Sequence, residues 1–474
     1  MNWPFEYTYT QLPDTLWARV DPIPVRAPRL LIFNDALADT LGLSPWLEDV
    51  DLAALFSGNW LPPGARPFAQ AYAGHQFGHF AVLGDGRALI LGEWCTADGQ
   101  HMDLQFKGSG RTPFSRRGDG RAAVGPMLRE YLISEAMYAL GIPTTRALAV
   151  VATGETVLRT RALPGAVLTR VASSHIRVGT FELAARINQT TLQALADYTI
   201  QRHFPACAHA KRPYLALLEA VIAHQARLIS QWLHVGFIHG VMNTDNMSIA
   251  GETIDYGPCA FMDTYHPDTV FSSIDTAGRY AFANQPTMGI WNLTRFAETL
   301  LPLLDERPDR AKALAQDALA DFGRQLQQHW LEGMAAKLAL SKPDSTLIYD
   351  LLQHMADTQQ DYTLTFRYLA QWLRQQTTPL PQTASWQAWL QRWRNGLTVP
   401  PYQAADLMDT VNPCIIPRNH QVQKALDGAE AGDMAPFNAL LNALRQPFCD
   451  NAATRPFMAA PREDERIMQT FCGT

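Results

Sequence analysis

Two oxygen-bearing side chains, Asn246 and Asp255, lie close together in a polar stretch of the chain. Amide and carboxylate oxygens are ligands that Mg²⁺ takes from proteins, with phosphates and water in its remaining positions. Asp245, directly before Asn246, is the further carboxylate of this loop that could orient a hydroxyl or take up its proton. The alternative role for Asp245 is to cap the loop. Together the three residues predict a site that holds a metal ion on phosphate groups.

The spacing around these residues follows the catalytic loop of kinases, with one exception. Kinases carry His-x-Asp, then four residues, then Asn, and an Asp-x-Gly after a short strand. His239, Asn246 and Asp255 stand at these positions, but Val241 takes the place of the catalytic Asp. An apolar side chain neither accepts a proton nor orients a hydroxyl, so metal binding is kept while ordinary phosphoryl transfer is in doubt. We expect His239 to be a structural hydrogen-bonding residue.

A lysine and a glutamate predict the phosphate-binding side of the same site. Lys107 follows the strand-like residues 103–106, and residues 126–140 have the apolar spacing of a helix that Gly141 ends. Glu130 lies early on this helix. In kinase-like folds a strand lysine contacts nucleotide phosphates and is held by a helix glutamate. The pattern favours a Lys107–Glu130 ion pair over a solvated lysine.

Two glycine-containing segments add backbone amides and cations. Residues 84–87 read Gly-Asp-Gly-Arg, which is either a hairpin turn or a turn whose amides approach phosphates. Residues 107–121 form a basic patch on a chain of net charge −6, and they predict either a polyphosphate site or a solvated loop. Its cations are Lys107, Arg111, Arg116, Arg117 and Arg121, against the single acid Asp119. The chain has neither a Walker P-loop nor a Rossmann glycine fingerprint.

Composition limits the cellular setting. The net charge of −6 gives no general attraction to nucleic acid or to anionic membranes, and no apolar run is long enough to span a bilayer. The N-terminus lacks the pattern of a signal peptide, and the six cysteines are scattered without a C-x-x-C motif. We therefore expect a cytoplasmic protein, a monomer, that binds neither nucleic acid nor membrane.

The order of the predicted elements indicates an α+β protein with a bilobal, protein-kinase-like fold and extensions at both ends. We expect an N-terminal extension (1–65), an N-lobe (66–165), a mainly helical C-lobe (166–376) and a helical C-terminal extension (377–474). Strands are predicted at 89–91, 104–106 and 147–151, and helices at 34–42, 126–140, 214–233, 386–393 and 434–444, with several more across 290–375. The polar and aromatic loop 412–420 is expected to pack back against the catalytic lobe.

Four motifs together resemble the selenoprotein O family. They are residues 72–78 (Tyr-Ala-Gly-His-Gln-Phe-Gly), the loop 107–121, the loop 239–247 and residues 255–258, and the likeness runs from about residue 5 to the C-terminus. The resemblance implies a protein adenylyltransferase of kinase-like fold that binds ATP in reversed orientation. Such an enzyme transfers AMP to Ser, Thr or Tyr hydroxyls of proteins and releases pyrophosphate. With the α-phosphorus facing the acceptor, the kinase Asp would lose its task, which accounts for Val241.

The resemblance also implies roles for individual residues. Asp245 would accept the proton, Asn246 and Asp255 would bind Mg²⁺ or alternatively Mn²⁺, and Glu130 would order Lys107. The nucleotide contacts would be Gly84, Gly86, Arg87, Lys107, Asp119, Gly120, Arg170, Arg177 and Asp255. Cys472 stands where relatives carry selenocysteine or cysteine, so a redox role there is weighed against an inert tail thiol, with Cys259 as a guessed partner.

Two other functions stay open at the level of sequence. One is a γ-phosphoryl kinase that uses Asp245 in place of the missing Asp, which Val241 disfavours. The other is a catalytically silent nucleotide-binding scaffold. A scaffold is expected to lose Lys107, Asn246 or Asp255, and all three are present.

Overall fold

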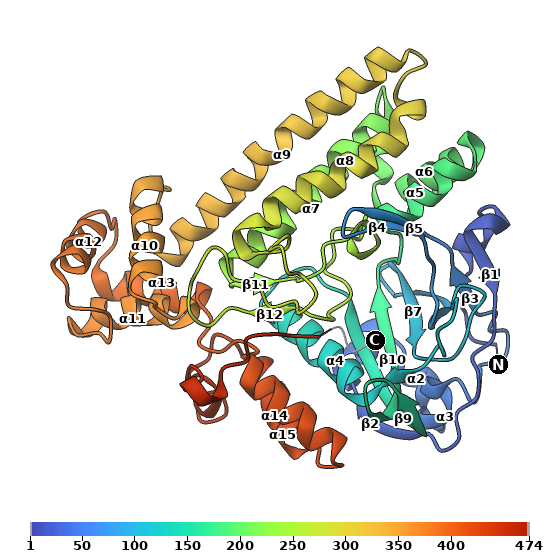
Figure 1. Cartoon of the computed structure of the whole chain (residues 1–474), viewed down its shortest axis with the longest axis horizontal. Coiled ribbons are helices and arrows are strands. Elements are labelled where there is room, and N and C mark those ends of the chain that lie inside the picture. Colours follow the sequence, from blue (N-terminus) through green and yellow to red (C-terminus); the bar gives the residue numbers. More distant parts are fainter. Residues whose placement is uncertain (1, 472–474) are drawn as a thin grey trace.

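A computed structural model of the protein describes residues 2–471 as a mixed α and β fold, in which one large antiparallel sheet packs beside a helical body (Figure 1). The strand order is β1-β3-β6-β7-β10-β9-β2, with β8 paired to β10. The strands are β1 (Trp17–Arg19), β2 (Arg29–Phe33), β3 (Phe68–Gln70), β6 (Ala88–Cys95), β7 (His101–Lys107), β8 (Ala122–Ala123), β9 (Arg146–Leu158) and β10 (Ala162–Ala172). The segment before residue 66 therefore supplies the strands at both ends of the sheet.

Helix α4 (Val124–Ala139) lies between the sheet and two C-terminal helices, α14 (Asn419–Glu430) and α15 (Ala435–Leu444) (Figure 1). Most of its residues are buried, which is expected for a helix covered on both sides rather than on one apolar stripe. Gly141 ends it in the left-handed region, with a φ of 75°. The C-terminal helices thus complete the core of the sheet body.

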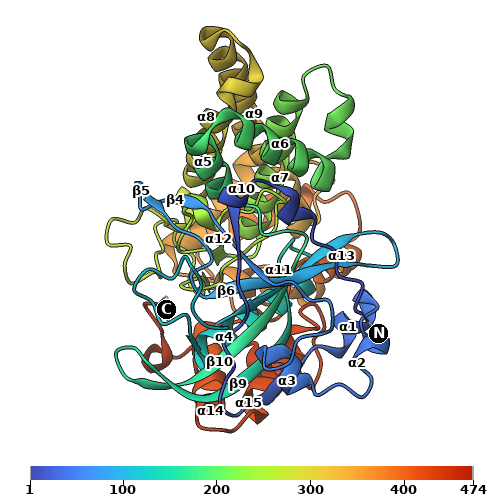
Figure 2. The same cartoon turned by 90° about the vertical axis from the view of Figure 1, so that its right-hand side faces the viewer.

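The helical body is seen from the side in Figure 2. Its main helices are α5 (Val178–Ile187), α6 (Gln189–His203), α7 (Pro213–His234), α8 (Gln285–Leu304) and α9 (Pro308–Lys337). A second helical group has its own core, which includes Trp386, Trp389 and Trp393. It consists of α10 (Ser345–Asp357), α11 (Tyr362–Gln375), α12 (Ala384–Asn395) and α13 (Pro401–Val411). None of the helices among residues 2–471 is long and apolar enough to cross a membrane.

Short elements connect the two bodies. A separate two-stranded ladder, β4 (Ala73–Gln76) with β5 (His79–Val82), contacts α5 and the 3-10 turn η4 (Thr244–Asn246). A second short pair of strands is β11 (Phe237–Ile238) with β12 (Ala260–Phe261). Apart from these connecting elements, the N-terminal segment also forms three helices, α1 (Asp35–Leu41), α2 (Ser44–Leu47) and α3 (Leu52–Ser57). Because β5 pairs with β4 and β6 joins the large sheet, the turn 84–87 links two sheets. The hairpin alternative for its Asp-Gly pair was wrong.

The predicted helices and strands are present; the helix ends differ by one or two residues, whereas the strands are longer than predicted, most of all β9, which continues to Leu158. The loop 412–420 also packs inward as expected, since Ile415 and Ile416 belong to the main core. Arg418 in this loop is completely buried and forms ion pairs with Asp263, beside β12, and with Asp361 at 2.8 Å. Asp361 also caps α11 by accepting a hydrogen bond from the backbone N–H of Leu364. The loop therefore joins the C-terminal segment to the helical body.

Replacing Arg418 by alanine should lower the free energy of unfolding by about 3–5 kcal/mol, because two carboxylates would lose their buried counter-ion. The matched control is Arg455→Ala, which removes an exposed pair with Asp450 at 2.7 Å and should change that free energy by about 1 kcal/mol or less. Chemical denaturation of both variants measures the difference. Equal losses would contradict the structural importance of the buried pair.

Candidate active site

Five charged side chains from four parts of the fold meet in one buried cluster. Lys107 Nζ lies 2.7 Å from Glu130 Oε2 and 2.9 Å from Asp255 Oδ1. Arg170 Nε donates to Glu130 Oε1 at 2.8 Å, and both Arg170 and Arg177 also donate to the Asp255 carboxylate. The sheet register explains the meeting of two cations, because Leu168 of β10 stands opposite Lys107 of β7 and Arg170 follows on the same face. The predicted Lys107–Glu130 ion pair is present.

The cluster holds three cations against two acids, and its charge shifts the pKa of both acids. Burial would raise the pKa of Asp255, but Arg170, Lys107 and Arg177 together hold it well below its usual range. Burial opposes ionisation of Glu130 as well, and Arg170 and Lys107 lower its pKa overall. Both acids are therefore ionised at neutral pH. The remaining positive charge in this low-dielectric setting favours an anionic ligand such as a polyphosphate.

Asp255 adopts a conformation that is uncommon for its residue type. Its φ is +64°, in the left-handed region that mainly glycine occupies. The three cations fix its side chain, and its carbonyl accepts a hydrogen bond from the N–H of Gly257 at 2.9 Å. Backbone strain of this kind persists where surrounding contacts determine the geometry, and it is frequent at active sites.

Asp245 is nearly buried, with 7% of its surface exposed, and it is poorly hydrogen-bonded. Its Oδ1 has no hydrogen-bond partner within residues 2–471, and Oδ2 accepts only a long bond of 3.4 Å from Gln76 Nε2. Burial raises the pKa of Asp245 to about 6, although Arg177 acts in the opposite direction. A poorly hydrogen-bonded carboxylate with a raised pKa is suited to proton transfer.

The loop between these acids is held by hydrogen bonds that leave one amide oxygen available. Asn246 Nδ2 donates to the carbonyl of Val241 at 3.1 Å, which orients the amide. His239 Nε2 lies 2.9 Å from the carbonyl of Ile254, so the structural role expected for His239 is confirmed. Within the described chain, no three His, Cys, Asp or Glu side chains gather as a metal site. The amide oxygen of Asn246 and the carboxylate of Asp255 are donors of the type that a hard cation takes, and in this structure protein cations bind both Asp255 oxygens.

The glycine turn (84–87) and the basic loop (107–121) contact each other beside Lys107. Ala88, the first residue of β6, stands opposite Lys107, so the turn 84–87 lies at that end of the strands. Thr112 Oγ1 donates to the carbonyl of Asp85 at 2.6 Å. A Cβ at Gly84 would lie 2.6 Å from the ring of Phe114, and the φ of this glycine is +134°. The basic loop 107–121 therefore packs directly over the turn 84–87.

Other predicted site residues lie outside the charged cluster. Asp119 pairs with Arg159 at 2.8 Å, on the turn between β9 and β10. Arg87 stands at the end of the glycine turn and forms no ion pair with any side chain among residues 2–471. Cys472 lies outside the described residues. Cys259 is buried, and burial raises the pKa of its thiol to about 11, so this cysteine stays protonated at neutral pH.

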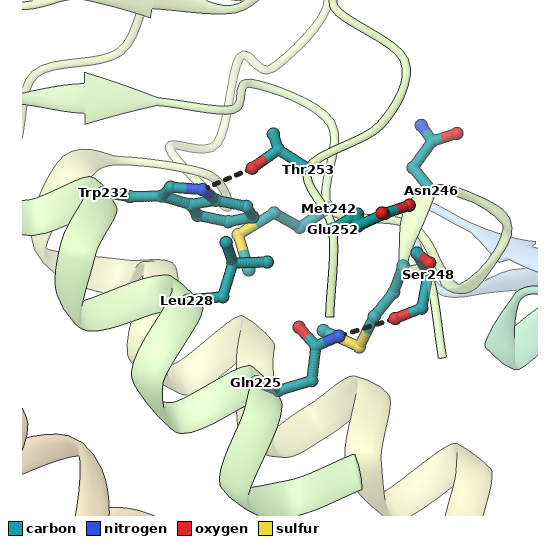
Figure 3. A pocket seen from close by; sticks show the side chains of 9 residues that line it. Gln225, Leu228, Trp232, Met242, Asn246, Ser248, Glu252 and Thr253 are labelled. Carbon is teal, nitrogen blue, oxygen red and sulfur yellow. Dashed lines mark hydrogen bonds between the residues drawn. The ribbon is translucent and has the colours of Figure 1, made fainter. Parts of the chain in front are cut away.

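A small cavity lies behind the 239–247 loop, on the side of helix α7 (Figure 3). Its volume is about 10 Å³, on the scale of one water molecule. Gln225 Nε2 donates to the carbonyl of Ser248 at 2.7 Å and Trp232 Nε1 donates to Thr253 Oγ1 at 2.9 Å across its wall (Figure 3). The cavity is too small for a nucleotide, and its walls support the loop from behind.

Comparison with known proteins identifies the family. The profile of the family described as "Protein adenylyltransferase SelO" matches residues 1–445. The chain belongs to the SelO family. It is 55% identical over 482 residues to the "Protein nucleotidyltransferase YdiU" of Syntrophotalea carbinolica, which covers 100% of this chain and 98% of that protein. The protein of the same name from Geobacillus kaustophilus is 54% identical over 483 residues, covering 100% of this chain and 99% of the relative. This SelO chain is therefore an enzyme of the nucleotidyltransferase class.

Sequence reasoning missed the contacts that residues 72–78 of this SelO chain make with the 239–247 loop. The motif carries the family resemblance, but its sequence predicts no role for its individual residues. A Cβ on Gly74 would lie 2.9 Å from Cβ and Cγ of Asp245, so this strand passes directly against the carboxylate. The two glycines of the motif were the only available signal of such close backbone approach.

Replacing Glu130 by glutamine should lower the free energy of unfolding by about 3–5 kcal/mol, because Lys107 and Arg170 would be buried with too little negative charge. The same substitution at Glu155 is the control, since its pair with Arg121 at 3.1 Å is partly exposed; that change should cost about 1 kcal/mol or less. Chemical denaturation compares the two. A Glu130→Gln protein as stable as the control would show that the cluster does not depend on this acid.

Proposed function

We propose that this protein is an adenylyltransferase that transfers AMP from ATP to Ser, Thr or Tyr hydroxyls of other proteins and releases pyrophosphate. The observation that carries the proposal is the exchange of roles in the catalytic loop. Val241 stands at the kinase Asp position, while Asp245 has a buried carboxylate oxygen free of hydrogen bonds. An acid in this new place suits an ATP bound in reversed orientation, with the α-phosphorus toward the acceptor.

The proposal includes a kinase-like arrangement of the chain. A strand lysine held by a helix glutamate and a long helix, α7, that leads into the 239–247 loop support this arrangement. In this view residues 66–165 are the N-lobe and 166–376 the C-lobe, with extensions at 1–65 and 377–474. The edge strands β1 and β2 and the helices α14 and α15 then complete the N-lobe from both extensions.

Phosphate binding is assigned to the cationic cluster and the glycine segments. Lys107, Arg170 and Arg177 would contact the phosphates, with Glu130 holding Lys107 in place. The remaining nucleotide contacts would come from the turn and the basic loop, namely Gly84, Gly86, Arg87, Asp119 and Gly120. Positioning and charge neutralisation are the main sources of catalysis in transfer reactions of this type.

The acceptor hydroxyl would lose its proton to Asp245 as its oxygen attacks the α-phosphorus. A new P–O bond then forms to the protein, the bond from the α-phosphorus to the bridging oxygen breaks, and pyrophosphate leaves. The cations of the cluster would stabilise the negative charge that the leaving group gains. Asn246 and Asp255 would hold Mg²⁺, which supplies further neutralisation of phosphate charge when bound.

Isotope transfer tests the proposed reaction directly. The protein is incubated with a protein mixture and ATP labelled at either the α- or the γ-phosphate. We expect acid-stable label on protein from α-labelled ATP only, because AMP carries the α-phosphate. Label from γ-labelled ATP alone would make the protein a kinase, and no label from either, with ATP binding intact, would indicate the silent scaffold.

The Asp245→Asn variant should transfer AMP at least about 100-fold more slowly, the lower end of the range for a lost general base. ATP binding should be kept, because Lys107, Arg170 and Arg177 are unchanged. Calorimetric titration with ATP and the transfer assay measure the two effects. Asp357→Asn, at an exposed position at the end of α10, is the control and should leave both unchanged. Full transfer activity in Asp245→Asn would remove Asp245 as the base.

A further inference from the structure

Strand β4 and the tip of its hairpin contact the catalytic loop through consecutive residues. The N–H of His75 donates to Thr244 Oγ1 at 2.6 Å, and Gln76 Nε2 donates to Asp245 Oδ2 at 3.4 Å. One residue further along, the N–H of Phe77 donates to Asn243 Oδ1 at 3.0 Å. The strand and its turn therefore lie directly against residues 243–245. Gln76 is the side chain that donates to the Asp245 carboxylate.

Glu182 on α5 ties the strand and the loop together. One of its oxygens contacts His75 Nδ1, and the other accepts a hydrogen bond from Thr244 Oγ1 at 2.6 Å. Thr244 thus accepts a hydrogen bond from His75 and donates one to Glu182. Glu182 is buried, with 5% of its surface exposed. His75 and Thr244 directly precede Gln76 and Asp245, so this clamp of His75, Glu182 and Thr244 fixes the backbone of both.

The turn between β4 and β5 has a backbone conformation that its residue types do not favour, and contacts with the 243–245 segment hold it there. Phe77 and Gly78 form the two-residue turn between β4 and β5, and their φ values are +50° and +87°. Such turns prefer Asn or Asp with Gly, and a phenylalanine at positive φ is strained. Its N–H bond to Asn243 and its ring contact with Tyr280, with centroids 5.3 Å apart, hold it there. Tyr280 donates to the same Asn243 oxygen at 2.6 Å.

We propose that His75, Glu182 and Thr244 are positioning residues for the reaction, and that Gln76 is the side chain through which they orient Asp245. The clamp holds β4 against the loop, so that Oδ1 of Asp245 is buried beside Gly74 and Gln76 orients Oδ2, the oxygen that we assign to the acceptor hydroxyl. This inference rests on the proposed role of Asp245 as the base. It adds to that role the residues that set the direction of the carboxylate, none of which touches the nucleotide-binding cations.

The Thr244→Val variant tests the clamp, because valine keeps the shape of threonine and removes the hydroxyl. We expect kcat for transfer to fall roughly 10- to 100-fold, the scale of a catalytic group displaced by about 1 Å. The KM for ATP should stay unchanged, since the cationic cluster is intact. Thr244→Ser restores the hydroxyl and should restore kcat. A merely structural threonine would not give this split between kcat and KM.

A matched control separates positioning from stability. Thr199 on α6 is also fully buried, and its hydroxyl donates to the carbonyl of Leu195 at 2.7 Å. Thr199→Val should lose stability in the same way and keep kcat. The clamp proposal is overturned if Thr244→Val is folded and keeps wild-type kcat, or if both valine variants lose activity in proportion to their loss of stability.

The Gln76→Ala variant covers the case in which Thr244→Val does not fold. Gln76 is partly exposed, so its truncation leaves the core intact, and kcat should again fall while the KM for ATP is kept. Wild-type kcat in Gln76→Ala would overturn the proposal. All variants are assayed with the label that the wild type transfers. A wild type that transfers only the γ-phosphate would disprove the adenylyltransferase proposal and still allow the clamp to be tested, whereas a wild type that transfers neither would overturn both.

Discussion

The carboxylate of Asp255 is the interaction on which the rest of the site depends. Three cations from three different elements, Lys107, Arg170 and Arg177, share its two oxygens in a nearly buried setting. Each of these charges would be costly to bury alone. The three cations are compensated by Asp255 and Glu130, and Asp255 is compensated by the cations. The large sheet, α4, α5 and the loop after residue 247 are thereby bound to one another at a single point.

Two acids of one loop are placed in opposite environments. Cations hold the pKa of Asp255 far below its usual range, whereas burial with few hydrogen bonds raises the pKa of Asp245 to about 6. Pairs of titratable groups whose surroundings separate their pKa values commonly divide binding and proton transfer between them. Here the two pKa values are separated by the neighbours of each acid, because three cations surround Asp255 and the backbone of β4 covers Asp245.

The terminal segments are structural parts of this arrangement. Residues 17–19 and 29–33 close the two ends of the sheet, and α14 and α15 cover the helix that carries Glu130. Buried Arg418 fixes the last segment to Asp263 and Asp361. At the far end, Thr470 bonds to the carbonyl of Pro258, close to the Asp255 loop. The chain therefore surrounds the site from both ends.

The sequence by itself determined the local features. Helix and strand positions follow from residue periodicity, because this pattern reflects hydrogen bonding and burial within one element. The Lys107–Glu130 pair and the structural role of His239 were predicted by comparing the motifs with those of kinase-like folds. Only the tertiary structure decided that Arg170 and Arg177 converge on Asp255. It also decided that β4 and β5 stand outside the large sheet, and that Gln76 and Glu182 reach the 239–247 loop. These contacts join residues far apart in the chain, and their geometry depends on how the sheet and helices pack, which no local pattern records.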